Sequence, residues 1–287
     1  MRKFTRSIKN LNFMKHNLKF GFCLMMALIF LSACKKDDDF VISEFIVISE
    51  DLTTQQELLE DNELEITEQI ETGLQSLMTR GFPTRSWSNT KGTYPNILTI
   101  DYGTAGVTSN NGRIRKGKII VQLSAPITST GAERIVSHED FFIDDVKITG
   151  MVILTNQGQN ALSQNLFLRT VTGRVLSFPT GKTIRWNALQ TLTQLEGSNT
   201  PNLKSDDEWS ILGTSSGVTR SGKIFNTSTP VALISRFSCP WIVKGISNLT
   251  FESNAFSIDF GDGTCNNAAT LILPNGNTKE FYFRRWW

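Results

Sequence analysis

Residues 165–195, NLFLRTVTGRVLSFPTGKTIRWNALQTLTQL, contain two runs of β-forming residues separated by a short turn sequence. Valine, leucine, isoleucine, threonine and aromatic residues fill both runs, and Pro179-Thr180-Gly181 lies between them. Such runs joined by a turn that contains proline and glycine are typical of a β-hairpin. The stretch therefore predicts two antiparallel strands, over 165–176 and 182–195.

The same composition extends from Tyr94 to the end of the chain, and no helical periodicity interrupts it. A second turn sequence, Pro274-Asn275-Gly276, again predicts a hairpin. Further strands are expected at residues 96–102, 118–123, 141–155, 208–213, 222–226, 231–237, 241–251, 256–260, 268–273 and 278–285. Many strands with short connections predict a mainly β fold, an antiparallel β-meander that forms a sandwich, an open barrel or a large curved sheet.

Short strings recur within this β domain, which is expected to span residues 94–287. Leu98–Gly103 resembles Phe256–Gly261, and Arg115–Ile119 resembles Arg220–Ile224. Either the domain consists of two related halves, or hairpins have converged on similar strings.

One helix is expected before the β domain, over Thr53–Thr79. Thr54-Gln55-Gln56-Glu57 fits a capping box, and apolar residues recur after it at helical spacing with acidic residues between them. The apolar stripe predicts a helix face that packs on the β domain or, alternatively, docks a partner. Residues 34–52 are interpreted as a tether, 53–80 as the helical segment and 81–93 as a linker rich in Gly, Pro, Ser and Thr.

The first 33 residues have the composition of a bacterial signal peptide. Six basic residues and no acidic residue lie within the first nineteen positions, and residues 20–33 are almost wholly apolar. This apolar run is too short for a helix across a bilayer core about 30 Å thick, which needs about 20 residues. Translation starts at Met1 or at Met14, and both starts leave a basic segment before the apolar run.

Leu31-Ser32-Ala33-Cys34 ends the apolar run and resembles a lipobox, the cleavage and acylation signal of bacterial lipoproteins. Cleavage there makes Cys34 the lipidated first residue, and two or more acyl chains hold a protein stably on a membrane. Lys35-Lys36-Asp37-Asp38-Asp39 follows, either as a solvated tether or as an export signal, since it resembles the run that directs lipoproteins of the Bacteroidota to the outer face of the outer membrane. The expected location is the outer membrane, with surface display favoured over a periplasmic orientation.

The composition of the mature chain excludes one class of partner. Removal of the six basic residues of the signal changes the formal charge from +2 to −4. A mildly acidic chain lacks the basic surface that binds phosphate backbones, so no nucleic acid is expected as a partner.

Two cysteines remain after the anchor, Cys239 and Cys265. An extracytoplasmic compartment permits a disulfide between them, and two separate buried thiols fit the sequence equally well. Two cysteines with the single mature histidine, His138, lack the paired spacing of a zinc site. No metal and no cofactor is expected.

Several motifs suggest chemistry but fit turns and loops better. Gly213-Thr214-Ser215-Ser216-Gly217 matches the G-x-S-x-G string of α/β-hydrolases, but its surroundings are β and His138 lies upstream, so a glycine-rich turn is expected. Asp259–Thr264 has too few carboxylates for an EF-hand loop and is interpreted as a tight turn. His138-Glu139-Asp140 is interpreted as a loop before a strand. No residue is assigned a catalytic role.

A set of strings follows in fixed order along the β domain: IDYG (100–103), GRIRKGKI (112–119), VKITG (146–150), NQG (156–158), GKTIRWN (181–187), EWSILGTSSGVTRSGKIF (208–225), SCPWIVKGI (238–246) and DFGDGTCNNAATLILPNG (259–276). This set resembles a family of uncharacterised cell-envelope lipoproteins of the Bacteroidota over about residues 94–285. Family members often carry a cysteine in the turn after the first string, where this chain has Ala105-Gly106-Val107, which leaves Cys239 and Cys265 as the only partners. The resemblance implies a β-rich surface lipoprotein and no particular activity.

Three functions fit these observations. The first is a non-enzymatic binding or structural lipoprotein, with a glycan, a protein or another envelope component as its ligand. The second is a carboxylate-based carbohydrate-active enzyme, which needs two acids across one cleft beside an exposed tryptophan. Acidic clusters at Asp144-Asp145 and Asp206-Asp207-Glu208 supply many such pairs. The third is an accessory subunit of an envelope transport or assembly complex that docks through the predicted helix.

Overall fold

The structure, a computed structural model, describes residues 34–71, 83–109, 111–200 and 204–283. The chain forms two compact units, Met1–Val47 and Ile48–Trp287. The predicted signal peptide, including Leu31, Ser32 and Ala33, lies outside the described residues. In the first unit, the described residues are helical.

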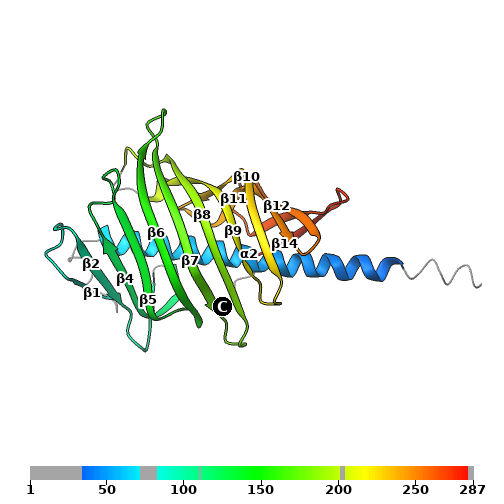
Figure 1. The fold of residues 1–287 in the computed structure, drawn as a ribbon, viewed down its shortest axis with the longest axis horizontal. Helices are drawn as coiled ribbons and strands as arrows, with labels where there is room; N and C mark the ends of the chain where they lie inside the picture. Colours follow the sequence, from blue (N-terminus) through cyan, green and yellow to red (C-terminus); the bar gives the residue numbers. More distant parts are fainter. Residues whose placement is uncertain (1–33, 72–82, 110, 201–203, 284–287) are drawn as a thin grey trace, which may run out of the picture. The chain divides into compact units, whose positions relative to one another are not determined.

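The second unit contains one antiparallel sheet of 14 strands, drawn in Figure 1. One helix, α2 (Cys34–Glu71), precedes the sheet and crosses the boundary between the units. The strands are β1 (Thr84–Trp87), β2 (Asn96–Asp101), β3 (Val107–Thr108), β4 (Ile114–Leu123), β5 (Glu133–Ile143), β6 (Val146–Gln159), β7 (Asn165–Ser177), β8 (Thr183–Glu196), β9 (Glu208–Val218), β10 (Ile224–Arg236), β11 (Cys239–Phe251), β12 (Asn254–Asp262), β13 (Ala268–Ile272) and β14 (Thr278–Tyr282). A short 3-10 turn, η2 (Lys204–Asp206), precedes β9.

The strands pair in chain order, except that β3 pairs with one end of β4 beside β2. The path runs from β1 at one edge to β14 at the other without closing. The prediction of an antiparallel meander is therefore confirmed, and the large curved sheet is the arrangement adopted among the three that the sequence allowed.

Three parts of the sheet differ from the predicted strands. The strand expected at 141–155 is two strands, because Asp144 and Asp145 form a turn with φ angles of 48° and 66°. β5 already begins at Glu133, so His138-Glu139-Asp140 lies within a strand and not in a loop. The strands expected at 222–226 and 231–237 form one strand, β10, whose register shifts between Ser228 and Val231.

The interpretation of Gly213–Gly217 as a turn is wrong, because the whole string lies within β9. A Cβ atom at Gly213 would overlap the carbonyl oxygen of Leu189, and one at Gly217 would overlap that of Arg185. Both carbonyls belong to β8, the neighbouring strand. The glycines therefore serve the close approach of two strands.

Glycine bulges interrupt the ladders of the sheet at several positions. Gly150 has a φ of 97° and lies where the β6–β7 register shifts between Thr149 and Met151. A Cβ atom at Gly150 would lie 2.5 Å from the carbonyl oxygen of Gly173. Bulges of this kind bend the strand and increase its twist, which curves the sheet.

The predicted beginning of the helix at Thr53 is wrong. α2 already includes Cys34, so the described backbone of residues 34–52 is helical. Thr53 and Thr54 are interior residues, and the Thr54 hydroxyl donates to the carbonyl oxygen of Glu50 (2.7 Å), so the pair forms no capping box. The expected final turns at 72–79 lie outside the described residues. β1 occupies part of the predicted linker 81–93.

Residues Ile48–Glu71 of α2 run across the strands of the sheet (Figure 1). Ile48, Leu59 and Ile66 are fully buried, as are Ile119 and Val121 of β4. Unusually, arginines are among the largest fully buried side chains, namely Arg115, Arg169 and Arg174. We call the sheet face that carries these three residues the inner face.

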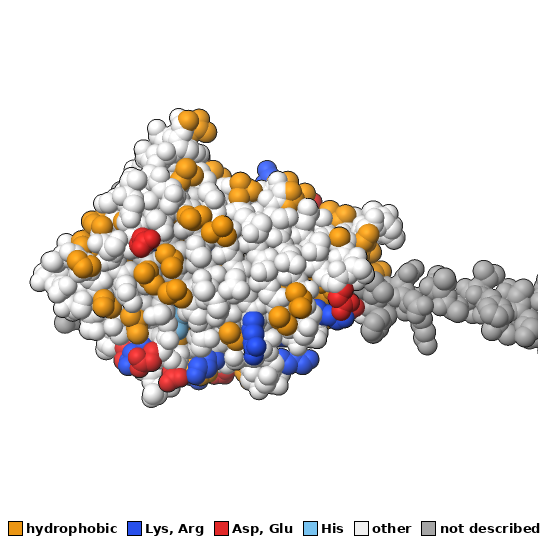
Figure 2. All heavy atoms as spheres, viewed as in Figure 1, with side chains coloured by type: hydrophobic (Ala, Val, Ile, Leu, Met, Phe, Trp, Pro, Cys, Tyr) orange, Lys and Arg blue, Asp and Glu red, His pale blue; other side chains and the backbone are white. Residues whose placement is uncertain are grey.

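The opposite face of the sheet has a different chemistry. Figure 2 shows scattered hydrophobic side chains among uncharged polar ones, with Lys, Arg, Asp and Glu gathered mainly along one margin. Leu189 of β8 and Leu212 of β9 are among the exposed large hydrophobic residues. The sheet thus buries Arg115, Arg169 and Arg174 on its inner face, and its opposite face exposes mainly uncharged side chains.

Candidate functional site

The candidate site lies between α2 and the inner face, where acidic side chains of the helix meet arginines of the sheet. Residues 48–71 contain nine acidic residues and no lysine or arginine. Like charges at helical spacing repel each other, so these side chains need cations from elsewhere in the chain. The arginines supply them.

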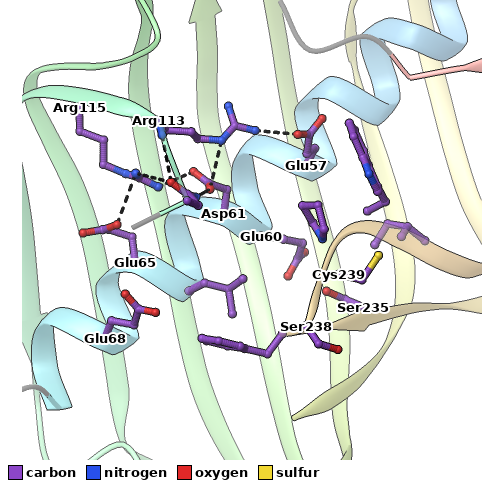
Figure 3. A pocket seen from close by; sticks show the side chains of 16 residues that line it. Glu57, Glu60, Asp61, Glu65, Glu68, Arg113, Arg115, Ser235, Ser238 and Cys239 are labelled. Carbon is purple, nitrogen blue, oxygen red and sulfur yellow. Dashed lines mark hydrogen bonds and ion pairs between the residues drawn. The ribbon is translucent and has the colours of Figure 1, made fainter. Parts of the chain in front are cut away.

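The first group of ion pairs joins α2 to β4 and the residue before it (Figure 3). Arg113 binds Glu57 through Nη2–Oε1 (2.6 Å) and Asp61 through Nε–Oδ1 (3.2 Å). Arg115 binds Asp61 through Nη2–Oδ2 (2.6 Å) and Glu65 through Nη1–Oε2 (3.4 Å). Both guanidinium groups are buried, so their charges depend on these carboxylates.

A second group of ion pairs lies further along the sheet. Arg134 of β5 pairs with Glu63. Arg169 of β7 binds Glu60 through Nη2–Oε1 (2.5 Å) and donates from Nε to the side-chain oxygen of Gln190 (2.9 Å). The helix is therefore attached to several strands by buried, charge-assisted hydrogen bonds, which are stronger than neutral ones.

The ion pair nearest the start of this unit fixes the helix to the β9–β10 turn. Asp51 accepts from the backbone nitrogen (2.8 Å) and from Nε (2.5 Å) of Arg220. Burial raises the pKa of Asp51, although the interactions with Arg220 oppose that rise.

A cavity of about 350 Å³ lies beside these ion pairs, between α2 and the β10–β11 hairpin. Figure 3 shows the helix along one side and the hairpin along the other. The helix contributes five carboxylates: Glu57, Glu60, Asp61, Glu65 and Glu68. The hairpin contributes Ser235, Phe237, Ser238, Cys239, Pro240, Trp241 and Ile242. Its size falls at the lower end of the range for small-molecule sites, about 300–1,000 Å³.

Burial and neighbouring charges shift the pKa of two groups that line this cavity, Glu68 and Arg115. The pKa of Glu68 is raised by burial and, less strongly, by the neighbouring charge of Glu65. Burial opposes the charge of Arg115, but the nearby Asp61 and Glu65 outweigh it and raise the pKa of the guanidinium. The cavity therefore offers carboxylates held in ion pairs with arginine and one carboxyl group, Glu68, that binds a proton more readily than usual.

Tyr102, the residue directly after β2, forms a hydrogen bond with Glu65. Its hydroxyl donates to Glu65 Oε1 (2.8 Å), and burial, followed by the charge of Glu65, raises the pKa of the phenol. The phenol therefore stays protonated and remains a donor.

A disulfide joins Cys239, at the start of β11, to Cys265, in the β12–β13 connection. Of the two arrangements that the sequence allowed, the structure adopts the bridge. Because Cys239 lines the cavity, the disulfide covalently links the β10–β11 wall of the cavity to the β12–β13 connection. The ring of Trp241 packs on that of Phe283 with 5.9 Å between centroids.

A second cavity, of about 210 Å³, continues along the same helix. It shares Glu60, Leu64, Ser235 and Phe237 with the first cavity. Trp209 lies in its lining, 5.7 Å from the ring of Phe167 between centroids. The two cavities thus form neighbouring compartments, each with one partly exposed tryptophan and several charged groups.

Two aspartates weighed from the sequence, Asp144 and Asp259, line neither cavity. Cys34 and Lys35, Lys36, Asp37, Asp38 and Asp39 form the first turns of α2 as described. Asp144 closes the β5–β6 turn, where its carboxylate accepts from Arg113 Nη1 (3.1 Å) and Ile114 N (2.8 Å). Asp259 accepts from Gly261 N (2.9 Å) near the end of β12. These two aspartates stabilise turns and strand ends.

The tryptophans divide between the core and the cavities. Trp186 is buried, Trp209 and Trp241 line the two cavities, and Trp87 lies under the ammonium group of Lys91 at 5.9 Å. Trp286 and Trp287 lie outside the described residues. Among the acidic clusters weighed from the sequence, only Asp207 lines either cavity.

Sequence reasoning missed the acids of α2 and the arginines of the inner face as site residues. The available signal was a helix with many acidic residues between its apolar ones, followed by β-forming segments that contain arginines: Arg115, Arg134, Arg169 and Arg174. Buried arginines are rare unless paired, so that combination points to an ion-paired interface.

Within the described ranges, no group of three or more His, Cys, Asp or Glu side chains is placed to hold a metal ion. None of the helices in the described part of the chain combines the length and apolar character needed to cross a membrane. No protein family, curated protein or solved structure matches the chain.

Proposed function

We propose that the chain is a lipid-anchored outer-membrane protein, displayed at the cell surface, that binds a carbohydrate without changing it. The anchor rests on the lipobox-like Leu31-Ser32-Ala33-Cys34 and on the charged run that follows it. The binding function rests on the cavity beside α2.

One observation carries the choice of ligand class: an aromatic ring, Trp241, lies in the same cavity as five carboxylates and two arginines. The face of an indole ring packs against the C–H groups of a sugar ring, since both surfaces are apolar. Carboxylates accept hydrogen bonds from hydroxyl groups, and guanidinium groups donate to hydroxyl oxygens. Few other small ligands use an apolar face and many hydroxyl groups together.

The ion pairs around the cavity support a ligand-binding role for it, in addition to their role in holding α2 on the sheet. Arg113 and Arg115 fix Glu57, Asp61 and Glu65 in one geometry before any ligand arrives. Preorganised groups lose less conformational entropy on binding, which raises affinity.

The test is a glycan array probed with the full chain purified in detergent. We expect a defined set of oligosaccharides to bind, and Trp241→Ala to weaken that binding at least tenfold, because the stacking surface is removed. Trp87→Ala is the matched control, since Trp87 lies outside both cavities, and its binding should equal that of the wild type. Equal loss in both variants, or no glycan bound, would refute the proposal.

A second function, hydrolysis of a glycan, is favoured by Glu68. A glycosidase needs one protonated carboxyl group as acid and one ionised carboxylate. The pKa of Glu68 is raised by burial, and Asp61 of the same cavity forms ion pairs with Arg113 and Arg115. Incubation of bound oligosaccharides with the wild type and Glu68→Gln, followed by mass spectrometry, separates the two functions. Shorter products that disappear in Glu68→Gln would replace the binding proposal with the enzymatic one.

The anchor has its own test. Mass spectrometry of the cell-envelope protein should find Cys34 acylated at the new N-terminus, and Cys34→Ala should lose surface labelling and membrane attachment. An unmodified chain that retains its leader would contradict the proposed location.

A further inference from the structure

The face of the sheet opposite the inner face, which we call the outer face, carries a continuous row of uncharged residues. Residues paired across neighbouring strands point to the same face, so the strand register identifies the row. It has one residue on each of ten strands: Ile97, Gln122, Ile135, Ile153, Thr170, Leu189, Thr214, Ser228, Asn248 and Ser257. None of these side chains is buried.

Two shorter rows lie on either side of the middle of this row. The first consists of Thr155, Leu168, Thr191 and Leu212, and the second of Asn187, Ser216, Asn226, Thr250 and Ala255. We call the three rows together the uncharged patch. Leu189 and Leu212 are 52% and 44% exposed. Contiguous exposed surface that contains large apolar side chains and no charge is typical of the core of a protein–protein interface.

The charged residues near the patch are already paired within the chain. At one end of the strands, four lysines bind carboxylates through Nζ: Lys116 to Asp145 (2.9 Å), Lys118 to Glu139 (2.8 Å), Lys147 to Asp140 (2.8 Å) and Lys223 to Glu252 (2.7 Å). Figure 2 shows charges gathered mainly along one margin of this face. The patch therefore presents no charge for a charged partner to complement, and it fits a partner surface that is itself uncharged.

The patch is large enough for a specific interface. Neighbouring strands lie about 4.8 Å apart and successive outward residues about 6.8 Å apart, so each residue covers roughly 33 Å² of the sheet. The nineteen residues of the three rows together cover roughly 600 Å². A specific interface buries at least about 500 Å² on each partner.

We propose that the uncharged patch packs face to face on the same patch of a second copy of this chain. A two-fold axis brings identical residues together, so only a patch without net charge packs on its own copy without repulsion. Thr170 and Leu189 occupy the middle of the long row, and full overlap of the two patches places them beside the axis. Beside Leu189, a shallow hollow lined by Thr172, Thr214 and other uncharged residues has room for a side chain of the second copy.

This contact has the form of a β-sandwich, in which two sheets lie about 10 Å apart with interdigitating side chains. It leaves α2 and the inner face outside the interface. The patch shares no residue with the lining of the proposed carbohydrate cavity, so the dimer does not depend on carbohydrate binding.

The first experiment is sedimentation equilibrium of the full chain in density-matched detergent, over a series of protein concentrations. We expect the wild type to approach twice the mass of one chain. Leu189→Lys should raise the dissociation constant at least tenfold, because each copy then brings a charge into an uncharged contact. Leu162→Lys is the matched control, because Leu162 is 77% exposed but lies in the β6–β7 turn, and it should associate like the wild type.

The second experiment tests whether the patch contacts its own copy. An equal mixture of Leu189→Lys and Leu189→Glu should form a dimer more tightly than either variant alone, because opposite charges then meet beside the axis. A wild type with the mass of one chain at every concentration, equal loss in Leu162→Lys, or no recovery in the mixture would each overturn the proposal. A monomeric wild type that floats with phosphatidylcholine vesicles, and loses this in Leu189→Lys, would assign the patch to a lipid surface instead.

Discussion

At the scale of single residues, most of the buried arginines pair with a carboxylate from a distant part of the chain. Arg115 is the clearest case: its side chain is fully buried, and Asp61 and Glu65 lie more than 45 residues before it. Removing one partner of such a pair leaves an uncompensated charge in the interior.

We predict that Arg115→Met lowers the free energy of unfolding by about 3 kcal/mol, the usual cost of breaking a buried ion pair. Lys118→Met, on the same strand, should change it little, because Lys118 pairs with Glu139 at the surface. Urea unfolding followed by circular dichroism measures both. Similar small losses in the two variants would show that the inner-face pairs do not stabilise the fold.

His138 gives a prediction for pH. It is stacked on Phe141, with 5.1 Å between ring centroids, and burial lowers its pKa to about 3, with a further contribution from the charge of Arg174. The unfolded chain has the ordinary value of about 6.5, so between pH 6.5 and pH 3 it binds a proton that the folded chain does not. The stability that His138 contributes is therefore present above about pH 6.5 and is lost as the pH falls toward 3.

We expect His138→Gln to flatten the pH dependence of stability in this window. The wild type should lose up to about 1.4 kcal/mol more per pH unit than the variant between pH 6 and pH 4. Urea unfolding at pH 4, 5, 6 and 7 compares the two slopes. Parallel slopes would mean that folding does not lower the pKa of His138.

At the scale of elements, α2 shows why sequence patterns predicted a helix but not its limits. The acidic and apolar periodicity indicated helix correctly over 55–71. The Thr54-to-Glu57 string fits a helix start equally well, yet the hydroxyls of Thr53 and Thr54 bond to the preceding turn of the same helix. Local propensity cannot distinguish a capping threonine from an interior one when upstream residues also support helix.

The sheet shows the same division between local and long-range information. Alternating β-formers located most strands, and Pro179-Thr180-Gly181 and Pro274-Asn275-Gly276 located two hairpin turns. Gly213 and Gly217 were interpreted as a turn because a local string does not show which strand pairs with it, and here β9 pairs closely with β8. Glycine marks a close approach as readily as a turn.

We predict that a peptide of residues 48–71 is largely unfolded at neutral pH. Its nine acidic residues repel each other without the arginines of the sheet, and most helical stability in proteins comes from tertiary packing, which the peptide lacks. Circular dichroism should show helix content rising as the pH falls from 7 to 3 and the carboxyl groups are neutralised. A peptide that is already mostly helical at pH 7 would contradict the dependence of α2 on the inner face.

At the scale of the whole molecule, the class of fold could be predicted from the sequence, but the site could not. The cavity depends on Glu57 of α2, Arg113 before β4 and Trp241 of β11 meeting at one place. No periodicity links residues so far apart, and Trp241 could equally have packed in the core. The proposed anchor rests on different information, because the lipobox-like Leu31-Ser32-Ala33-Cys34 is a local string that the sequence alone contains.

The central claim is that the cavity between α2 and the β10–β11 hairpin binds a carbohydrate. The most direct measurement is an NMR titration of the full chain with an oligosaccharide selected on the array, in which the indole N–H signals are followed. We expect the Trp241 signal to shift in a saturable way while the signals of Trp87 and Trp186 stay in place. Unchanged Trp241 with shifts elsewhere, or no shift with any oligosaccharide, would contradict it.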